Sequence, residues 1–131
     1  MGGEVKVISE PLTFIGSDSV VAARAALAAG EQNRYWPYAQ LLFENQGKKN
    51  SGYVTDDFLT DQAMETPGLD VDEWSSDLKP SSFTQELQAA QAQSAGVNAT
   101  PTLIFSGPGG QTKLVGPQDY DRISQAIAQV D

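Results

Sequence analysis

Two short acidic stretches carry the side chains best suited to metal chemistry: Asp56-Asp57 and residues 70–73, which hold three carboxylates. Carboxylate oxygens bind calcium well, but a calcium loop also needs regularly spaced oxygen ligands, a central glycine and a distal glutamate. The second stretch lacks these features. Both stretches stand where helices are predicted to begin, and acidic side chains there interact favourably with the helix dipole. We interpret them as helix-capping residues and expect no metal site.

Nucleophilic catalysis is restricted because the chain contains no cysteine and no histidine. Cysteine chemistry and thiolate metal sites are excluded, and a catalytic serine has no histidine to act as its base. A Ser-Lys arrangement is conceivable, but no motif supports one. The glycine-rich segment 106–110 joins two predicted strands rather than a strand and a helix, so it does not resemble a phosphate-binding loop. We expect no catalytic residue and no cofactor.

Composition limits the partners that this chain can bind. Its 131 residues give a net charge of −9, and the 8 lysines and arginines form no basic stripe. Binding to nucleic acid or to an anionic membrane surface needs clustered cations, so both are disfavoured. No apolar run approaches the roughly 18 residues of a membrane span, and no signal peptide is recognisable. The length and the 40% hydrophobic content favour one globular domain.

The sequence predicts a mixed set of helices and strands along the chain. Alternating β-branched residues predict a strand over residues 4–9, and apolar residues at helical spacing predict several helices after it. The predicted elements are a strand at 4–9, helices beginning near Ser17, Glu31, Thr55, Asp70 and Ser81 or Ser82, strands at 102–105 and 112–115, and a helix after Gly116-Pro117. The last two strands are predicted to form a hairpin. This order indicates an α/β fold.

Aromatic residues near position 36 have two interpretations. Tyr35, Trp36 and Tyr38 could line a peptide-binding groove, or their helical spacing could place them in the core. We expect Trp36 in the core and Tyr38 on the outer face. Trp74 is expected to anchor its short helix.

Pro101 lies between the glycine that ends a predicted helix, Gly96, and the apolar strand that begins at Thr102. Proline cannot donate a hydrogen bond to a sheet, so it is found at the first residue of a strand or on an edge. The segment Gly96-Val97 through Thr100-Pro101-Thr102 resembles the cis-proline segment of thioredoxin-fold proteins. The stretch from Pro11 to Gln46, with its alanine-rich helix, Ala-Gly-Glu-Gln and Leu-Phe-Glu-Asn-Gln, resembles the DsbA-like branch of that superfamily.

The resemblance implies an incomplete thioredoxin-like fold of the DsbA-like kind. Residues 4–15 and 97–131 would form the thioredoxin-like part of a single domain, and residues 16–96 would form its helical insertion. The family activity is thiol–disulfide oxidoreduction or isomerisation on exported proteins, which implies an extracytoplasmic location. The resemblance also implies that the bond before Pro101 is cis, and that the backbone of Thr100 pairs with an extended polypeptide substrate.

This sequence departs from the family pattern in one important respect. Family members begin with a strand and a helix carrying Cys-x-x-Cys, whereas this sequence begins at the strand that follows them. We therefore expect the chain to be inactive alone, either as a fragment of an oxidoreductase or as a non-catalytic peptide-binding or assembly module. The absent strand would lie between residues 4–9 and 102–105. We expect either that residues 5–9 move into its place, or that a second copy completes the sheet through strand swapping or an edge-to-edge dimer.

Overall fold

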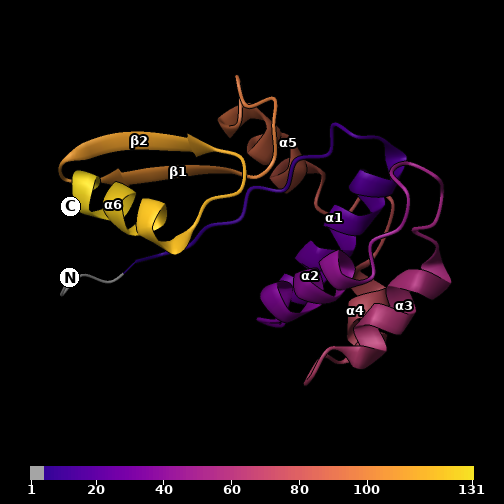
Figure 1. Cartoon of the computed structure of the whole chain (residues 1–131). Coiled ribbons are helices and arrows are strands. Elements are labelled where there is room, and N and C mark those ends of the chain that lie inside the picture. Colours follow the sequence, from indigo (N-terminus) through magenta and orange to yellow (C-terminus); the bar gives the residue numbers. More distant parts are fainter. Residues whose placement is uncertain (1–4) are drawn as a thin grey trace. The chain divides into compact units, whose positions relative to one another are not determined.

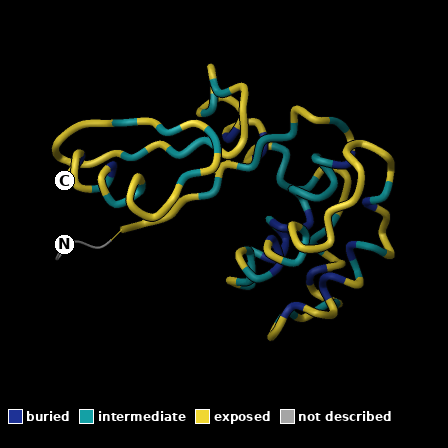
Figure 2. The backbone as a smooth tube through the Cα atoms, in the orientation of Figure 1, coloured by how far each residue is buried: buried dark blue, intermediate teal, exposed yellow. Residues whose placement is uncertain are grey.

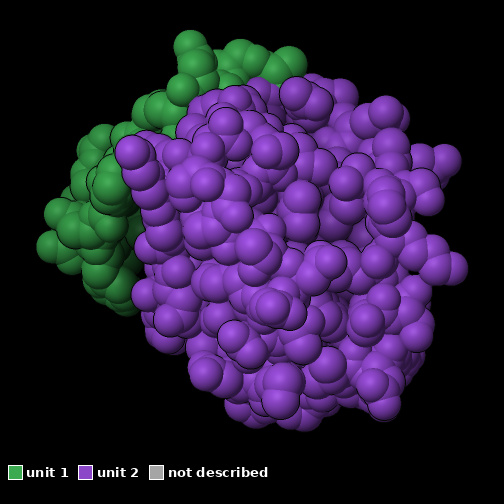
Figure 3. Space-filling model, turned by 90° about the vertical axis from the view of Figure 1, so that its right-hand side faces the viewer, with its two compact units in different colours: residues 1–8, 95–131 green, residues 9–94 purple. Residues whose placement is uncertain are grey.

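The computed structural model describes residues 5–131 and divides into two compact units. One comprises the described residues up to Ile8 together with residues 95–131, and the other comprises residues 9–94 (Figure 3). The first is called the hairpin unit and the second the helical unit. Their elements are labelled in Figure 1. In the described residues the fold is mixed α/β, with six helices and a two-stranded sheet.

The helical unit contains five of these helices: α1 (Ser17–Gly30), α2 (Tyr35–Glu44), α3 (Asp56–Glu65), α4 (Val71–Asp77) and α5 (Thr84–Gln93). The predicted caps of two helices are confirmed, because the Thr55 hydroxyl accepts from the Phe58 N–H and the Asp70 carboxylate accepts from the Glu73 N–H. Such bonds satisfy backbone donors that the first turn leaves unpaired. The acidic stretches therefore occupy helix starts, as expected.

Two helix starts differ from the prediction. Helix α2 begins at Tyr35 rather than near Glu31. The reason is that Asn33, between α1 and α2, has the left-handed conformation with φ 56°, which breaks the helix. Helix α5 begins at Thr84 rather than at Ser81 or Ser82, because Phe83 has φ 59°. A helix cannot continue through a left-handed residue. Asn tolerates this conformation better than most residues.

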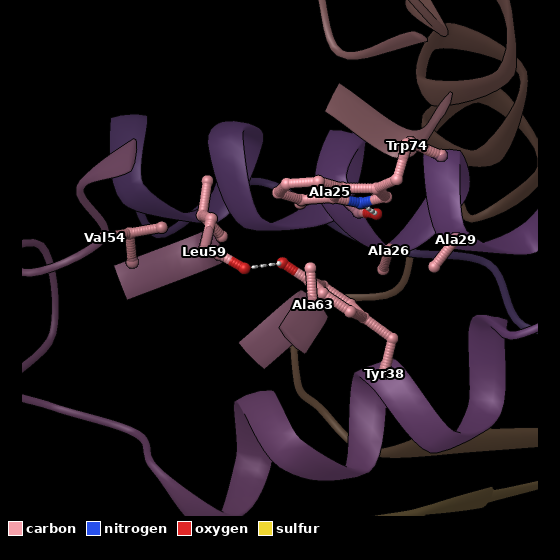
Figure 4. Packing of buried hydrophobic residues seen from close by; sticks show 9 residues of the cluster. Ala25, Ala26, Ala29, Tyr38, Val54, Leu59, Ala63 and Trp74 are labelled. Carbon is pink, nitrogen blue, oxygen red and sulfur yellow. Dashed lines mark hydrogen bonds between the residues drawn. The ribbon is translucent and has the colours of Figure 1, made fainter. Parts of the chain in front are cut away.

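The core of the helical unit is built around Tyr38 and Trp74 (Figure 4). Four alanines of α1 are fully or almost fully buried: Ala25, Ala26, Ala28 and Ala29. Their small side chains leave room for the two aromatic rings, whose centroids are 5.8 Å apart. The Tyr38 hydroxyl donates to the Leu59 carbonyl at 3.1 Å, and the Trp74 indole N–H donates to the Ala25 carbonyl at 3.0 Å. Both polar groups are thus satisfied although they are buried.

The expected positions of two aromatic residues are wrong. Tyr38 is fully buried, whereas Trp36 is 54% exposed. The inward face of α2 includes Tyr38, Ala39 and the partly buried Leu42, and Trp36 lies two residues before Tyr38, which is about 200° around a helix. The predicted anchoring role of Trp74 is confirmed by its 2% exposure.

The hairpin unit consists of β1 (Thr102–Gly107), β2 (Gly110–Val115) and α6 (Tyr120–Val130). The strands are antiparallel, with Ile104 opposite Lys113, and the predicted hairpin is confirmed. The turn is shorter than predicted, because only Pro108 and Gly109 lie outside the strands. The Gly109 N–H donates to the Val130 carbonyl at 2.7 Å, which ties the turn to the end of α6.

The predicted strand at residues 4–9 is wrong for residues 5–9, and Glu4 lies outside the described residues. Val5, Val7 and Ile8 are 58–68% exposed, and the segment makes no backbone hydrogen bond to residues 5–131. It therefore does not pair with β1, contrary to one of the two expected arrangements. Alternation and β-branching favour extended backbone, but a strand also needs a partner for its N–H and C=O groups.

Candidate peptide-binding loop

The loop that leads into β1 positions the two residues that the sequence singled out. Helix α5 ends at Gln93, and the chain then turns through Gly96, whose φ of +84° suits a residue without a Cβ. The peptide bond between Thr100 and Pro101 is cis, and β1 begins at the next residue, Thr102. The loop thus delivers Thr100 and Pro101 to the beginning of a strand.

Two hydrogen bonds hold this loop in place. The Pro101 carbonyl accepts from the Gly116 N–H at 2.8 Å, which fastens the loop to the chain just after β2. The Thr102 hydroxyl donates to the Ala99 carbonyl at 2.7 Å and closes a short turn around Thr100. Because residues on both sides of Thr100 are tied down, its backbone is held in a defined position.

Thr100 itself is left with free backbone groups. Thr100 and Pro101 are both exposed, and within residues 5–131 neither the N–H nor the C=O of Thr100 has a hydrogen-bonding partner. An exposed backbone donor and acceptor are the groups through which an extended peptide adds to a protein backbone. The loop can therefore pair with an extended polypeptide without any reactive side chain.

The other candidate residues do not join this loop. Asp56 and Asp57 lie in the first turn of α3, and Asp72 and Glu73 in that of α4. In the described part of the chain, no three acidic side chains gather closely enough to hold a metal ion. Trp36, which the sequence assigned to the core, instead exposes half its surface on α2 with Phe43, which is 72% exposed. The helical spacing of the aromatic residues did not indicate that Trp36 would be exposed.

Known proteins of similar sequence identify the family. A profile of the DSBA-like thioredoxin domain matches residues 6–128. The chain belongs to the DsbA-like thioredoxin family. It is 27% identical over 130 residues to a probable disulfide bond formation protein D of Bacillus cereus, and 25% identical to the protein of that name in Bacillus anthracis. Each match covers 95% of this chain and 57% of the relative.

A solved structure supports the DsbA-like fold. The crystal structure of a thioredoxin-like oxidoreductase from Silicibacter pomeroyi DSS-3 matches with a TM-score of 0.67 and 21% identity. The match covers 92% of this chain and 65% of that protein. This DsbA-like chain therefore spans less than two thirds of the proteins it resembles, and it contains no cysteine. None of the described helices is long and apolar enough to cross a membrane.

Proposed function

We propose that this chain is part of a DsbA-like thiol–disulfide oxidoreductase or isomerase, in which the Thr100–Pro101 loop holds an extended polypeptide. The observation that carries the proposal is the exposed Thr100 backbone, with both hydrogen-bonding groups free among the described residues. The family match and the names of the Bacillus relatives support the connection to disulfide formation. By analogy with the family, the site of action is extracytoplasmic.

The chain alone holds polypeptide but does not exchange disulfides. Exchange proceeds by attack of a thiolate on a disulfide sulfur, with release of the second sulfur as a thiolate. The chain has no sulfur nucleophile, because its cysteine count is zero. In the complete oxidoreductase the reactive thiols would be supplied by residues outside these 131, and the loop would align the substrate beside them.

A binding titration tests the role of the loop. Carboxymethylated insulin B chain is a suitable probe, since it is extended and has no free thiol. We expect it to shift the NMR resonances of the Thr100 and Thr102 amides saturably, and the Thr102 amide is the common readout for the variants. Thr100→Pro removes the N–H donor and should weaken binding, whereas Thr100→Val keeps both main-chain groups and should bind like the unmodified chain. Equal binding by all three chains, or no binding by the unmodified chain, contradicts the role of Thr100.

The second candidate function is a non-catalytic peptide-binding or assembly module. Backbone pairing needs no cysteine, and the free groups of Thr100 are available in this chain as it stands. The DNA preceding the Met1 codon distinguishes the two candidates. In-frame coding sequence that contains Cys-x-x-Cys supports the oxidoreductase, and a ribosome-binding site immediately before Met1 supports the separate module. Insulin-reducing turnover by the pure chain contradicts both.

A further inference from the structure

The short segment between β2 and α6 is joined to the Thr100–Pro101 loop. Strand β2 ends at Val115, and residues 116–118 lead to the N-cap of α6 at Asp119. The Gly116 N–H donates to the Pro101 carbonyl at 2.8 Å. The position of the loop therefore depends on the orientation of the peptide group that carries this N–H.

The side chain of Gln118 is bonded to that peptide group. Its amide nitrogen donates to the Val115 carbonyl at 2.9 Å and to the Gly116 carbonyl at 3.1 Å. Both partners are carbonyl oxygens, which only accept hydrogen bonds, so the nitrogen of the side-chain amide must face them. Gln118 is half-buried, and its bond to Gly116 is partly buried. The side chain is therefore held against the backbone rather than extended into water.

The hydrogen bonds of Gln118 and Pro101 meet on one planar peptide group. The Val115 carbonyl and the Gly116 N–H belong to the same peptide bond, which is trans, since the cis bond of the described residues is the one before Pro101. The two groups of a trans peptide point in opposite directions. Gln118 thus holds one side of this group while the Pro101 carbonyl lies on the other, and hydrogen bonds in such a chain strengthen one another.

We propose that Gln118 is a positioning residue for the binding of the extended polypeptide. It holds the Gly116 N–H against the Pro101 carbonyl and so keeps the free backbone groups of Thr100 in place. Gln118 acts through Gly116 rather than by contact with the polypeptide. A loop that is fixed before binding loses less conformational entropy when it accepts a partner. This inference rests on the proposed function, because it assigns Gln118 to the same site.

A second glutamine of the hairpin unit provides a matched control. Gln111 lies in β2, and its side-chain amide donates to the Ser106 hydroxyl at 2.9 Å. This bond joins two exposed side chains near the turn of the hairpin and does not involve the Thr100–Pro101 loop. Gln111→Ala therefore removes an identical amide from the same unit without removing a contact of the loop.

Titration with carboxymethylated insulin B chain, followed at the Thr102 amide, tests the role of Gln118. For Gln118→Ala we expect the dissociation constant to rise about two- to tenfold, the effect typical of losing one hydrogen bond. Gln118→Glu keeps the length of the side chain but replaces the donor by a carboxylate, which only accepts, so it should bind at least as weakly. Gln111→Ala should bind like the unmodified chain.

The Gly116 amide distinguishes positioning from a general loss of stability. In both Gln118 variants we expect faster hydrogen exchange of the Gly116 amide and a smaller NMR scalar coupling across its hydrogen bond to the Pro101 carbonyl. Exchange at Phe105, in the middle of β1, should stay as in the unmodified chain. Equal acceleration at Phe105 would mean that the whole hairpin opens, and it would overturn the positioning role.

Two further results overturn the inference. One is binding by Gln118→Ala that equals binding by the unmodified chain, and the other is a Gly116 amide that the Gln118 variants leave unchanged. Both contradict this inference alone, because the unmodified chain can still bind through Thr100. Absence of binding by the unmodified chain contradicts the proposed function and this inference together.

Discussion

The helical unit and the hairpin unit bury their apolar side chains to very different extents. In the helical unit, Tyr38, Leu59 and Trp74 are almost completely removed from water, and the polar groups of the two aromatic residues are hydrogen-bonded. Among the described residues of the hairpin unit, only Ala126 and Val130 of α6 are buried (Figure 2). The unit that carries the candidate binding loop therefore leaves its other described apolar side chains partly or fully exposed.

This contrast indicates a division of roles between the two units. A well-packed unit resists local opening, whereas a unit with few buried contacts opens more readily. The free backbone groups of Thr100 belong to the hairpin unit. We therefore propose that the helical unit contributes stability and that the hairpin unit binds the extended polypeptide.

The largest expected effect is in the helical core. Trp74→Ala removes a ring that is 2% exposed and packs against Tyr38, so it should lower the free energy of unfolding by about 3–5 kcal/mol. Urea denaturation followed by circular dichroism measures this change. The exposed Trp36 is the matched control, since Trp36→Ala should change stability by less than about 0.5 kcal/mol. Similar losses for both tryptophans would contradict the assigned core.

A glycine substitution tests the packing of the hairpin unit. A Cβ added at Gly107 would overlap the backbone carbonyl oxygen of Val130, so the strand or α6 must shift. We expect Gly107→Ala to destabilise this unit by about 1–3 kcal/mol. Hydrogen exchange should show faster opening at Leu103 and Phe105, with the helical unit unchanged. Gly30→Ala is the control, because a Cβ there meets only ordinary van der Waals contacts.

Alkaline pH should weaken the helical unit selectively. Burial raises the pKa of the Tyr38 phenol above its ordinary value of 10.0, so the folded state keeps a proton that the unfolded state loses. Stability from this group is fully present below about pH 10 and falls as the pH rises further. Tyr38→Phe should lose about 1 kcal/mol at neutral pH through the missing hydrogen bond. Its unfolding free energy should fall less steeply in alkali, as measured by urea titrations at several pH values.

The smallest effects are expected at the helix caps. Thr55→Ala removes the acceptor for the Phe58 N–H and should reduce stability by about 0.5–1 kcal/mol. Thr55→Ser keeps the hydroxyl and should restore most of the loss in thermal unfolding experiments. If alanine and serine are equivalent, the cap contributes nothing to the helical unit.

Local sequence signals predicted the elements whose causes are themselves local. The caps at Thr55 and Asp70 depend on residues three positions apart, and the hairpin depends on the turn between two adjacent strands. The family and the α/β class followed from segments that resemble DsbA-like proteins in order and spacing. The residues at the loop were singled out in the same way, since Thr100 and Pro101 stand directly before an apolar strand.

The errors arose where structure depends on distant partners or on single backbone angles. Residues 5–9 have the pattern of a strand, but no described segment pairs with them. The left-handed conformation of Asn33 moved the start of α2. The orientation of α2 was not fixed by aromatic residues alone, so Trp36 and Tyr38 were assigned to the wrong faces. The free groups of Thr100 could be recognised only after the hydrogen bonds around it were known.

The most direct test of the division of roles is a map of amide shifts across the whole chain as carboxymethylated insulin B chain is added. We expect saturable shifts at Thr100 and its neighbours in the hairpin unit, with the amides of the helical unit unchanged. Shifts centred instead on α2, around the exposed Trp36 and Phe43, would place binding on the helical unit and contradict this division of roles.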